Sequence, residues 1–260
     1  MKTEDIKITP QWSKSKDEIW NEVFADHEEA ETSPKVKRLS FWKYAAAAVV
    51  MFIIATGAFA WLYETTEQAA RGSHLAVNLP DGSKVNLNSD SKLSYKPYWW
   101  FASRSVTLKG EAFFEVKPGS RFTVESFGNE VRVLGTSFNI FARAESYRVT
   151  CLTGKVEVRA NNEKTTLTPN MQVYLRDGKL DISDNIDGLQ SIGWTQNKFS
   201  FIGVPLADVV KEIERQYDIQ ITSNAKLDYL YTGNFSKEKK PEEVLEIVGK
   251  PFGITFNIAP

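Results

Sequence analysis

The sequence is poor in the residues that usually build metal centres and catalytic triads. Cys151 is the single cysteine among 260 residues, so one chain can form neither an internal disulfide nor a cysteine-rich zinc or iron–sulfur site. The two histidines, His27 and His74, lie on opposite sides of the longest apolar run, which leaves most hydrolase mechanisms without their usual base. The sequence therefore predicts neither a cofactor, a metal site nor an enzyme.

An excess of charge of one sign is also missing. The formal net charge is −1, so no global field would draw the chain to nucleic acid, and direct nucleic-acid binding is not expected. Apolar material is ample, because 42% of the residues are hydrophobic against 25% that are charged. The chain is long enough to form more than one compact domain.

One long hydrophobic run is present. Residues 44–63 read YAAAAVVMFIIATGAFAWLY and contain no charged side chain. A helix needs about 20 apolar residues to cross a bilayer, so this run predicts a transmembrane helix. A cleaved secretory signal would have a shorter apolar stretch and would not follow some forty residues of polar chain.

The charges that flank this run predict its orientation. Four basic residues and no acid come just before it: Lys35, Lys37, Arg38 and Lys43. Glu64 and Glu67 follow it. Because cytoplasmic flanks carry the excess of lysine and arginine, the N-terminus is expected in the cytoplasm and the C-terminus in the periplasm. The sequence thus predicts a single-pass protein of the inner, cytoplasmic membrane.

The predicted cytoplasmic tail, residues 1–43, contains an amphipathic helix. After Thr9-Pro10, a suitable N-cap and first helical position, one apolar stripe follows at helical spacing: Trp12, Ile19, Trp20, Val23 and Phe24. The opposite face is acidic, and a lone helix cannot bury two tryptophans against itself. Anionic headgroups would repel the acidic face, which favours a basic protein partner. The alternative is a tail that only supports the topology of the anchor.

After a linker at residues 64–71, residues 72–187 form short β-rich strings with glycine turns between them. The expected turn glycines are Gly82, Gly110, Gly135, Gly154 and Gly178. Their spacing gives a loose period in the lower range of solenoid coils. The pattern predicts a mainly β domain, a β-solenoid or roll, with a sandwich as the alternative.

Residues 188–260 change to an alternation of strands and helices. A strand KFSFIGV leads into a helix that begins at Pro205, and a second helix begins at Pro241 and ends at Gly249. The order is β-α-β-β-α-β, which predicts a small α/β domain. Its sheet edges and helix faces would suit docking to a similar domain.

At this point the motifs resemble a known family. LPDGSKVNLNSDSKLSY, VTLKGEAFFEVKP, VRVLGTSFNIFA, VTCLTGKVEV and LTPNMQVYL look like the signature strings of the FecR family of transmembrane anti-sigma regulators. The string FSFIGVPLADVVKEIERQYDIQI resembles the secretin and TonB short N-terminal type of domain. The resemblance covers roughly residues 72–260.

The resemblance implies signalling across a Gram-negative envelope. Members of the family hold an extracytoplasmic-function sigma factor on the cytoplasmic side and sense the signalling domain of a TonB-dependent outer-membrane transporter on the periplasmic side. Transcription of nutrient-uptake genes would be controlled in this way, in many members with envelope and intramembrane proteases. The tail stripe would then bind the sigma factor, and five aromatic residues would bind the transporter's signalling domain: Phe199, Phe201, Tyr229, Tyr231 and Phe235.

The chain departs from the family pattern in its tail. Many members carry a longer, multi-helix sigma-binding domain before the membrane, whereas 43 residues precede the apolar run here. A weaker inhibitor or an activator of the sigma factor is therefore expected in place of a strong inhibitor.

Some members are thought to cleave themselves at a Gly-Thr bond, which corresponds here to Gly135-Thr136. The Thr136 hydroxyl would attack the Gly135 carbonyl with the help of strain and a nearby base. A turn glycine that leads into the strand at residues 137–141 is the favoured interpretation, because no base can be named from the sequence.

Two other groups of residues invite a functional interpretation. Asp81, Glu111 and Glu115 could pair as carboxylates, but acids beside turn glycines are normally solvated turn formers. Trp99-Trp100-Phe101 could stack on a ligand, although packing or protein contact is the more common use of such a cluster.

A second class of function remains open, a membrane-anchored periplasmic module that binds glycan or peptide. The aromatic cluster would be its ligand platform, and its tail would be dispensable for its output.

Overall fold

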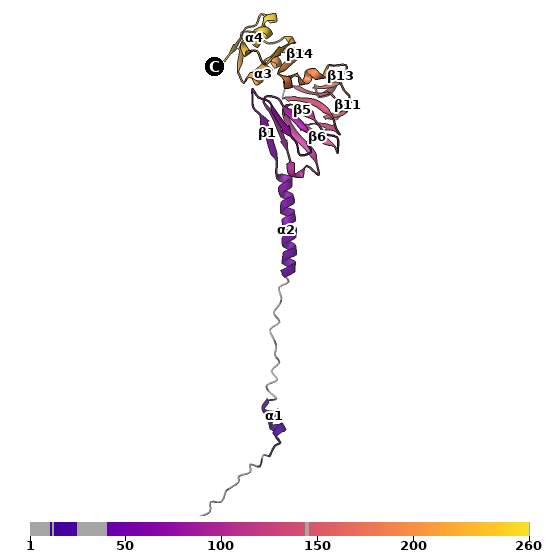
Figure 1. Ribbon diagram of the computed structural model, residues 1–260, viewed down its shortest axis with the longest axis vertical. Helices are drawn as coiled ribbons and strands as arrows, with labels where there is room; N and C mark the ends of the chain where they lie inside the picture. Colours follow the sequence, from indigo (N-terminus) through magenta and orange to yellow (C-terminus); the bar gives the residue numbers. More distant parts are fainter. Residues whose placement is uncertain (1–10, 12, 25–40, 144–145, 260) are drawn as a thin grey trace, which may run out of the picture. The chain divides into compact units, whose positions relative to one another are not determined.

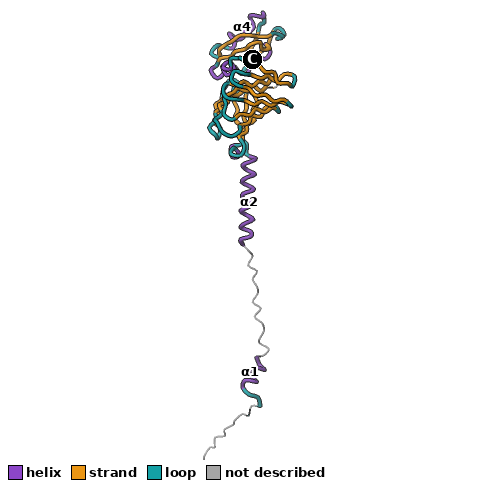
Figure 2. Tube along the Cα trace, turned by 90° about the vertical axis from the view of Figure 1, so that its right-hand side faces the viewer, coloured by secondary structure: helices purple, strands orange, loops and turns teal. Residues whose placement is uncertain are grey.

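The computed structural model describes residues 11, 13–24, 41–143 and 146–259. The chain divides into two compact units, Met1–Phe52 and Ile53–Pro260, which are described separately. Figure 1 gives the order of the elements along the chain, and Figure 2 shows the same trace coloured by secondary structure.

In the first unit, helix α1 spans Lys16–Phe24 within the predicted cytoplasmic tail. Ser15 begins it with a reciprocal capping box, since its hydroxyl accepts from the Glu18 amide at 3.2 Å and its amide donates to the Glu18 carboxylate at 2.9 Å. No side chain of α1 is buried. A helix of 9 residues is marginal alone in water, so a partner surface would add to its stability.

The apolar run forms helix α2, Phe41–Leu62. With 22 residues and a rise of about 1.5 Å per residue, α2 is about 33 Å long, close to the thickness of a bilayer's hydrocarbon core. Among the described residues it is the one helix long and apolar enough to cross a membrane.

The β domain follows α2 with thirteen hydrogen-bonded strands arranged as two layers that share strand β5 (Figure 1). The first layer contains, in spatial order, β1 (Thr65–Ala69), β4 (Ser91–Tyr95), β5 (Arg104–Glu115), β6 (Phe122–Ser126), β7 (Asn129–Val133), β10 (Val156–Ala160) and β11 (Glu163–Leu167). The second contains β2 (Leu75–Asn78), β3 (Lys84–Leu87), β5 again, β8 (Ser137–Arg143), β9 (Ser146–Cys151), β12 (Gln172–Arg176) and β13 (Lys179–Ser183).

Strand β5 bends from one layer into the other at Gly110. Its first half pairs with β4 and β6, and its second half pairs with β3 and β8. Gly110 has φ +104°, and a Cβ built there would lie 2.8 Å from the Cα of Ser91, so only glycine fits this corner. The expectation that Gly110 forms a turn between strands is therefore wrong, because the residue lies inside a continuous strand.

A single apolar core fills the space between the two layers. Phe114 stacks on Phe138 with ring centroids 5.0 Å apart and meets Phe122 of the first layer at 6.3 Å. All three are fully buried, as is Cys151.

The predicted mainly β class is confirmed, and the shared strand closes the sheet nearly into a barrel. Apart from β5 with β6, the strand pairs described are antiparallel. A roll or sandwich of this kind fits the layers better than the parallel coils of a solenoid.

The segment 64–71 is not a linker, contrary to expectation. Thr65–Ala69 form β1, which pairs with β4 from Thr65 opposite Tyr95 to Ala69 opposite Ser91. Ala69 is buried in the core. Polar residues such as Thr66 and Gln68 masked the strand in the sequence, because β1 lies at the edge of its layer and buries only part of one face.

The C-terminal module has the predicted β-α-β-β-α-β order. It comprises η3 (Gly188–Gln196), β14 (Lys198–Pro205), α3 (Leu206–Tyr217), β15 (Ile221–Ser223), β16 (Leu230–Ser236), α4 (Pro241–Gly249), η4 (Lys250–Phe252) and β17 (Phe256–Ile258). Strand β14 pairs with β16, and β15 pairs with β17, both antiparallel. Helix α3 buries an apolar stripe of Leu206, Val209, Val210 and Ile213, whereas Ile247 of α4 is exposed.

Candidate functional site: the polar junction between the β domain and the C-terminal module

The turn between β1 and β2 caps the C-terminal end of helix α3. Arg71 donates through Nη2 to the carbonyls of Glu214 and Ile219 at 2.8 and 3.0 Å, and the Gly72 amide donates to the Arg215 carbonyl at 2.8 Å. These carbonyls lie in or just after the last turn of α3, where a helix lacks internal donors and favours a cation. The junction therefore stabilises α3 from the β domain.

Gln216, fully buried on α3, is the centre of the junction. Its amide nitrogen donates to Asn88 Oδ1 at 2.7 Å and to Glu212 Oε1 at 2.8 Å. Its amide oxygen accepts from the Ser89 hydroxyl at 3.1 Å and lies 3.2 Å from His74 Nε2. Both ends of one side chain are thus used to connect the two domains.

Glu111, on β5, is a buried carboxylate at the next position in the network. Its two oxygens accept from the side-chain amides of Asn88 at 2.7 Å and Asn139 at 2.8 Å. Burial, reinforced by the negative charge of Glu212, raises the pKa of the Glu111 carboxyl. The expectation that Glu111 is a solvated turn former is wrong, because the C-terminal module covers this face of β5.

Glu212 behaves differently from Glu111. Burial alone would raise the pKa of Glu212, but the positive charges of Arg215 and Arg143 outweigh burial and lower it. Arg215 Nη2 lies 2.8 Å from Glu212 Oε2. The junction therefore holds one carboxylate kept ionised by arginine and one that burial pushes toward protonation.

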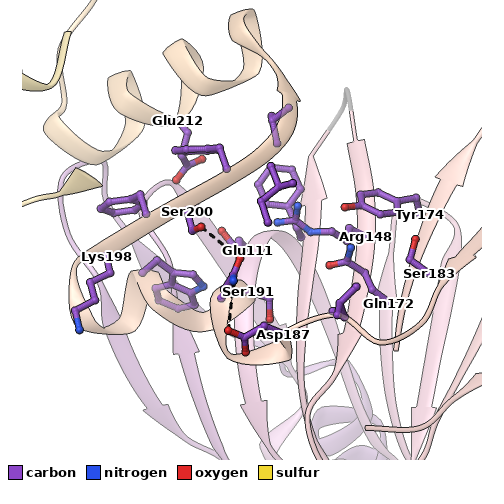
Figure 3. Close-up of a pocket in the computed structure, with 18 of the residues that line it drawn as sticks. Glu111, Arg148, Gln172, Tyr174, Ser183, Asp187, Ser191, Lys198, Ser200 and Glu212 are labelled. Atoms are coloured by element: carbon purple, nitrogen blue, oxygen red, sulfur yellow. Dashed lines mark hydrogen bonds between the residues drawn. The ribbon is translucent and has the colours of Figure 1, made fainter. Parts of the chain in front are cut away.

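A pocket of about 410 Å³ opens beside this network (Figure 3). It is lined by Glu111 and Arg148 of the second layer, by Tyr174 of β12, and by Trp194 and Phe201 of the C-terminal module. The Arg148 guanidinium lies over the rings of Phe141 and Tyr174, at 5.1 and 5.9 Å from their centroids. Arg148 Nε and Trp194 Nε1 are buried and have no hydrogen-bond partner among the described residues.

The polar side chains of the junction bond mainly to one another. Within the described part of the chain, no three histidine, cysteine, aspartate or glutamate side chains are close enough to hold a metal ion. The titratable groups of the junction are instead bonded to amides and arginines. Such a buried hydrogen-bonded network fixes the orientation of the parts that it joins.

The five aromatic residues expected to bind a partner do not form one surface. Phe199, Tyr231 and Phe235 are buried in the core of the C-terminal module, so a partner cannot contact them directly in this fold. Phe201 is half-buried and lines the pocket, and Tyr229 is exposed and stacks on Phe252 with centroids 4.8 Å apart.

A β-bulge in β14 explains why the alternation of apolar and polar residues along this strand did not predict which side chains face outward. The register between β14 and β16 shifts between Phe201 and Val204, so Val204 takes the inward place opposite Tyr231. Ile202, 69% exposed, lies in the bulge, and Leu230, 67% exposed, is paired with Pro205. These two exposed apolar residues were missed as candidates for contact, whereas the exposed Tyr229 was among the expected ones.

The tail stripe is exposed where the structure describes it. Trp20, Val23 and Phe24 are exposed on α1, with the rings of Trp20 and Phe24 4.4 Å apart, and Ile19 is half-buried. Trp12 lies outside the described residues.

Gly135-Thr136 leads into strand β8, as the turn interpretation predicts. The buried Thr136 hydroxyl donates to the Lys155 carbonyl at 3.0 Å, and a Cβ at Gly135 would lie 2.8 Å from the Cα of Pro118. Close packing thus accounts for the glycine. Self-cleavage at this bond stays a prediction.

The aromatic cluster divides between core and surface. Trp100 is buried against Tyr95 and Phe122, with ring centroids 5.9 Å from each, which is the packing role. Trp99 is half-buried, and Phe101 is 85% exposed. The three do not form one flat ligand platform.

The sequence did not reveal the junction, although one pattern in β5 indicates that both faces of this strand are covered. Ala112, Phe113 and Phe114 are consecutive apolar residues in β5, a pattern typical of a strand covered on both faces. Phe113 indeed packs against the core of the C-terminal module. The pattern gives no hint of Gln216, which lies more than a hundred residues away.

The fold and junction define a class, a chain with one membrane-length helix followed by a β domain joined to a small α/β module. Two family models match the sequence: FecR protein at residues 64–157, and FecR, C-terminal, at residues 198–259. The chain belongs to the FecR family, and the family is one of anti-sigma regulators.

Solved structures support this assignment. A candidate anti-sigma factor from Parabacteroides distasonis ATCC 8503, solved at 2.50 Å, is 31% identical and superposes with a TM-score of 0.69 over 74% of this chain and 92% of that chain. A second crystal structure of a candidate anti-sigma factor from the same organism, at 1.65 Å, is 29% identical, with a TM-score of 0.69 over 75% of this chain and 100% of that chain. A comparison with curated proteins gave no significant match.

Proposed function

We propose that this FecR-family regulator carries a signal from an outer-membrane TonB-dependent transporter to an extracytoplasmic-function sigma factor, and so controls nutrient-uptake genes. Helix α2 crosses the inner membrane with the tail in the cytoplasm and residues 64–260 in the periplasm. The family membership is the observation that carries this proposal.

The sigma factor binds the exposed stripe of the tail in this proposal. Trp20 is 62% exposed, and its ring packs at a tilt against that of Phe24 on a helix with no buried side chain. Buried aromatic anchors supply most of the energy of protein interfaces, so a partner that covers these two rings would gain affinity and order the helix.

The transporter's signalling domain binds the C-terminal module at the exposed ends of β14 and β16. Ile202, Tyr229 and Leu230 supply apolar contact there. In the described part of the chain, β14 and β16 form a two-stranded sheet, so each has one edge without a strand partner. A strand of the signalling domain can add to such an edge.

Crosslinking in intact cells followed by affinity purification tests both contacts. The full chain is compared with a chain lacking residues 1–31 and with Trp20→Ala, with Asn21→Ala as the matched exposed control on the same helix. We expect the sigma factor to depend on the tail and on Trp20, and the transporter to be recovered regardless. Recovery of neither partner, under conditions that capture known envelope complexes, would refute the proposal.

The pocket of about 410 Å³ supports one competing function, a membrane-anchored module that binds glycan or peptide. In that case deletion of residues 1–31 would leave the output unchanged. Loss of sigma-dependent transcription on the same deletion argues for the regulator.

A further inference from the structure

Residues 96–103, here called the aromatic loop, form a compact turn after β4 with exposed rings. The Ala102 and Ser103 amides donate to the Trp99 carbonyl at 3.0 and 3.1 Å, so the turn is closed by its own backbone. Buried Trp100 fixes the loop to the core, whereas Tyr98 is 56% and Phe101 85% exposed. A rigid support with outward aromatic rings is a costly surface to leave in water.

The aromatic loop lies against the end of helix α2. Tyr98 is 5.1 Å from Tyr63 and 6.0 Å from Phe59, measured between ring centroids. Lys96 Nζ lies 4.7 Å from the centroid of the Trp61 ring. The loop is therefore placed at the level of the aromatic residues that end the apolar helix.

That level is the membrane interface if α2 crosses a bilayer. The helix, about 33 Å long, just matches a hydrocarbon core of about 30 Å, so Trp61 and Tyr63 reach the headgroup layer. Tryptophan and tyrosine favour this layer because their rings are apolar and their tips polar. The aromatic loop adds Tyr98 beside Tyr63, carries Trp99 and Phe101 in the same turn, and contains Lys96 but no acidic residue.

We propose that the aromatic loop inserts Phe101 and Tyr98 into the lipid headgroup region of the membrane that α2 crosses. The partner is the bilayer itself, because the end of helix α2 contacts the aromatic loop and so holds the loop at the membrane surface. Rings of this kind bury about 5–10 Å into the boundary between headgroups and acyl chains. The inference rests on the proposed membrane anchorage and goes beyond it, since an anchored domain can also stand clear of the lipid.

Seated in this way, the β domain has a fixed orientation relative to the bilayer. The helix and the loop are two points of attachment, and a single flexible tether would leave the domain free to rotate. A pull on the C-terminal module then acts on the helix end as a tilt against the membrane surface.

The test uses the full chain reconstituted in vesicles of anionic and zwitterionic phospholipid. A nitroxide label is attached at Phe101→Cys, and its collisions with oxygen, which concentrates in lipid, are compared with those of a water-soluble nickel chelate. Phe127→Cys is the matched control, because Phe127 is 57% exposed in the turn that ends β6, at the opposite end of the β domain. The unsubstituted chain is the labelling blank, since Cys151 is buried.

We expect the ratio of oxygen to nickel accessibility to be several-fold higher at position 101 than at position 127. Equal ratios at the two positions would overturn the inference, as would a label at 101 shielded from both reagents, which would point to a protein contact. Val50→Cys in α2 reports the anchor separately. A label in lipid at 50 but in water at 101 refutes the loop insertion alone, whereas water at both refutes the anchorage.

Discussion

Glu111 is a carboxyl group that the fold has taken out of water and bonded to amides rather than to a cation. Asn88 and Asn139 donate to its two oxygens, and the Asn139 side-chain oxygen has no partner among the described residues. If the Asn139 amide rotates, its oxygen can accept a hydrogen bond from a protonated Glu111 carboxyl. The site can therefore hold either charge state, with burial favouring the neutral one.

The raised pKa of Glu111 predicts the pH dependence of stability. Because the native state keeps a proton that the unfolded chain has lost, the free energy of unfolding falls as the pH rises above the ordinary carboxyl pKa of 4.5. In Glu111→Gln this contribution disappears, so wild type loses stability relative to the variant from acid toward neutral pH. Urea unfolding of the full chain in detergent micelles, followed by tryptophan fluorescence, measures the difference.

At low pH the two proteins should agree within about 1 kcal/mol, because a neutral amide replaces a neutral acid. Glu111→Ala is the contrasting variant and should be less stable at every pH, since two amide donors lose their acceptors. A difference between wild type and Glu111→Gln that stays constant across pH would contradict the proposed titration.

Strand β5 shows at the scale of an element how a glycine position can mislead. Gly110 allows one strand to serve both layers, and the Ser91 backbone occupies the space where a side chain would lie. We expect Gly110→Ala to cost about 3 kcal/mol or more, from the backbone strain at φ +104° and the clash together.

Gly128→Ala is the control for Gly110→Ala, because Gly128 has φ +78° but nothing within 4 Å of a built Cβ. It should cost about 1 kcal/mol from strain alone. Comparable losses for the two variants in urea unfolding would show that the approach of Ser91 carries no cost.

The cap on helix α3 gives another prediction at the element scale. Arg71 bonds to two carbonyls as well as to Asp218, and the ion pair itself is largely exposed, with side-chain exposures of 39% and 65%. We expect Asp218→Asn to cost less than about 1 kcal/mol and Arg71→Met to cost about 2 kcal/mol. Hydrogen exchange at the end of α3 should rise in Arg71→Met alone.

If the two variants accelerate exchange equally, the ion pair and not the helix cap holds the junction. Arg71→Lys separates these cases further. A lysine keeps the charge but cannot bridge two carbonyls with a planar fork, so it should resemble Arg71→Met.

Local patterns in the sequence were enough to predict several elements. The apolar run gives α2, and the stripe of Leu206, Val209 and Ile213 gives α3, because both patterns depend on neighbours within a few turns. Strand β1 and the bulge in β14 were missed, since an edge position and a register shift are fixed by strands distant in sequence.

At the scale of the whole molecule, the junction cannot be predicted from local sequence patterns. Gln216 meets Asn88 across 128 positions of sequence, and nothing in either segment marks the other. The α/β module was predicted correctly, but its position over β5 was not. The only sign in the sequence that this face of β5 is covered is the apolar run Ala112-Phe113-Phe114. Long-range polar pairing needs the fold before it can be inferred.

The buried hydrogen bonds of the junction lead us to expect that the β domain and the C-terminal module move as one body during signalling. A disulfide tests this idea. A Cβ built on Gly72 lies 3.5 Å from the Cβ of Asp218, within the range of about 3.5–4.5 Å for a disulfide, so Gly72→Cys with Asp218→Cys should crosslink. The backbone at Gly72, with φ +76°, would cost about 1 kcal/mol. Burial raises the pKa of Cys151 to about 11, so this thiol should not compete for disulfide formation.

We expect a sigma-dependent reporter to respond equally in cells with and without envelope disulfide formation, with Gly72→Cys alone as the control for strain. A response that is lost only when the bridge forms would show instead that the junction opens, and the signal would then pass through separation of the two domains rather than through their joint motion against the membrane.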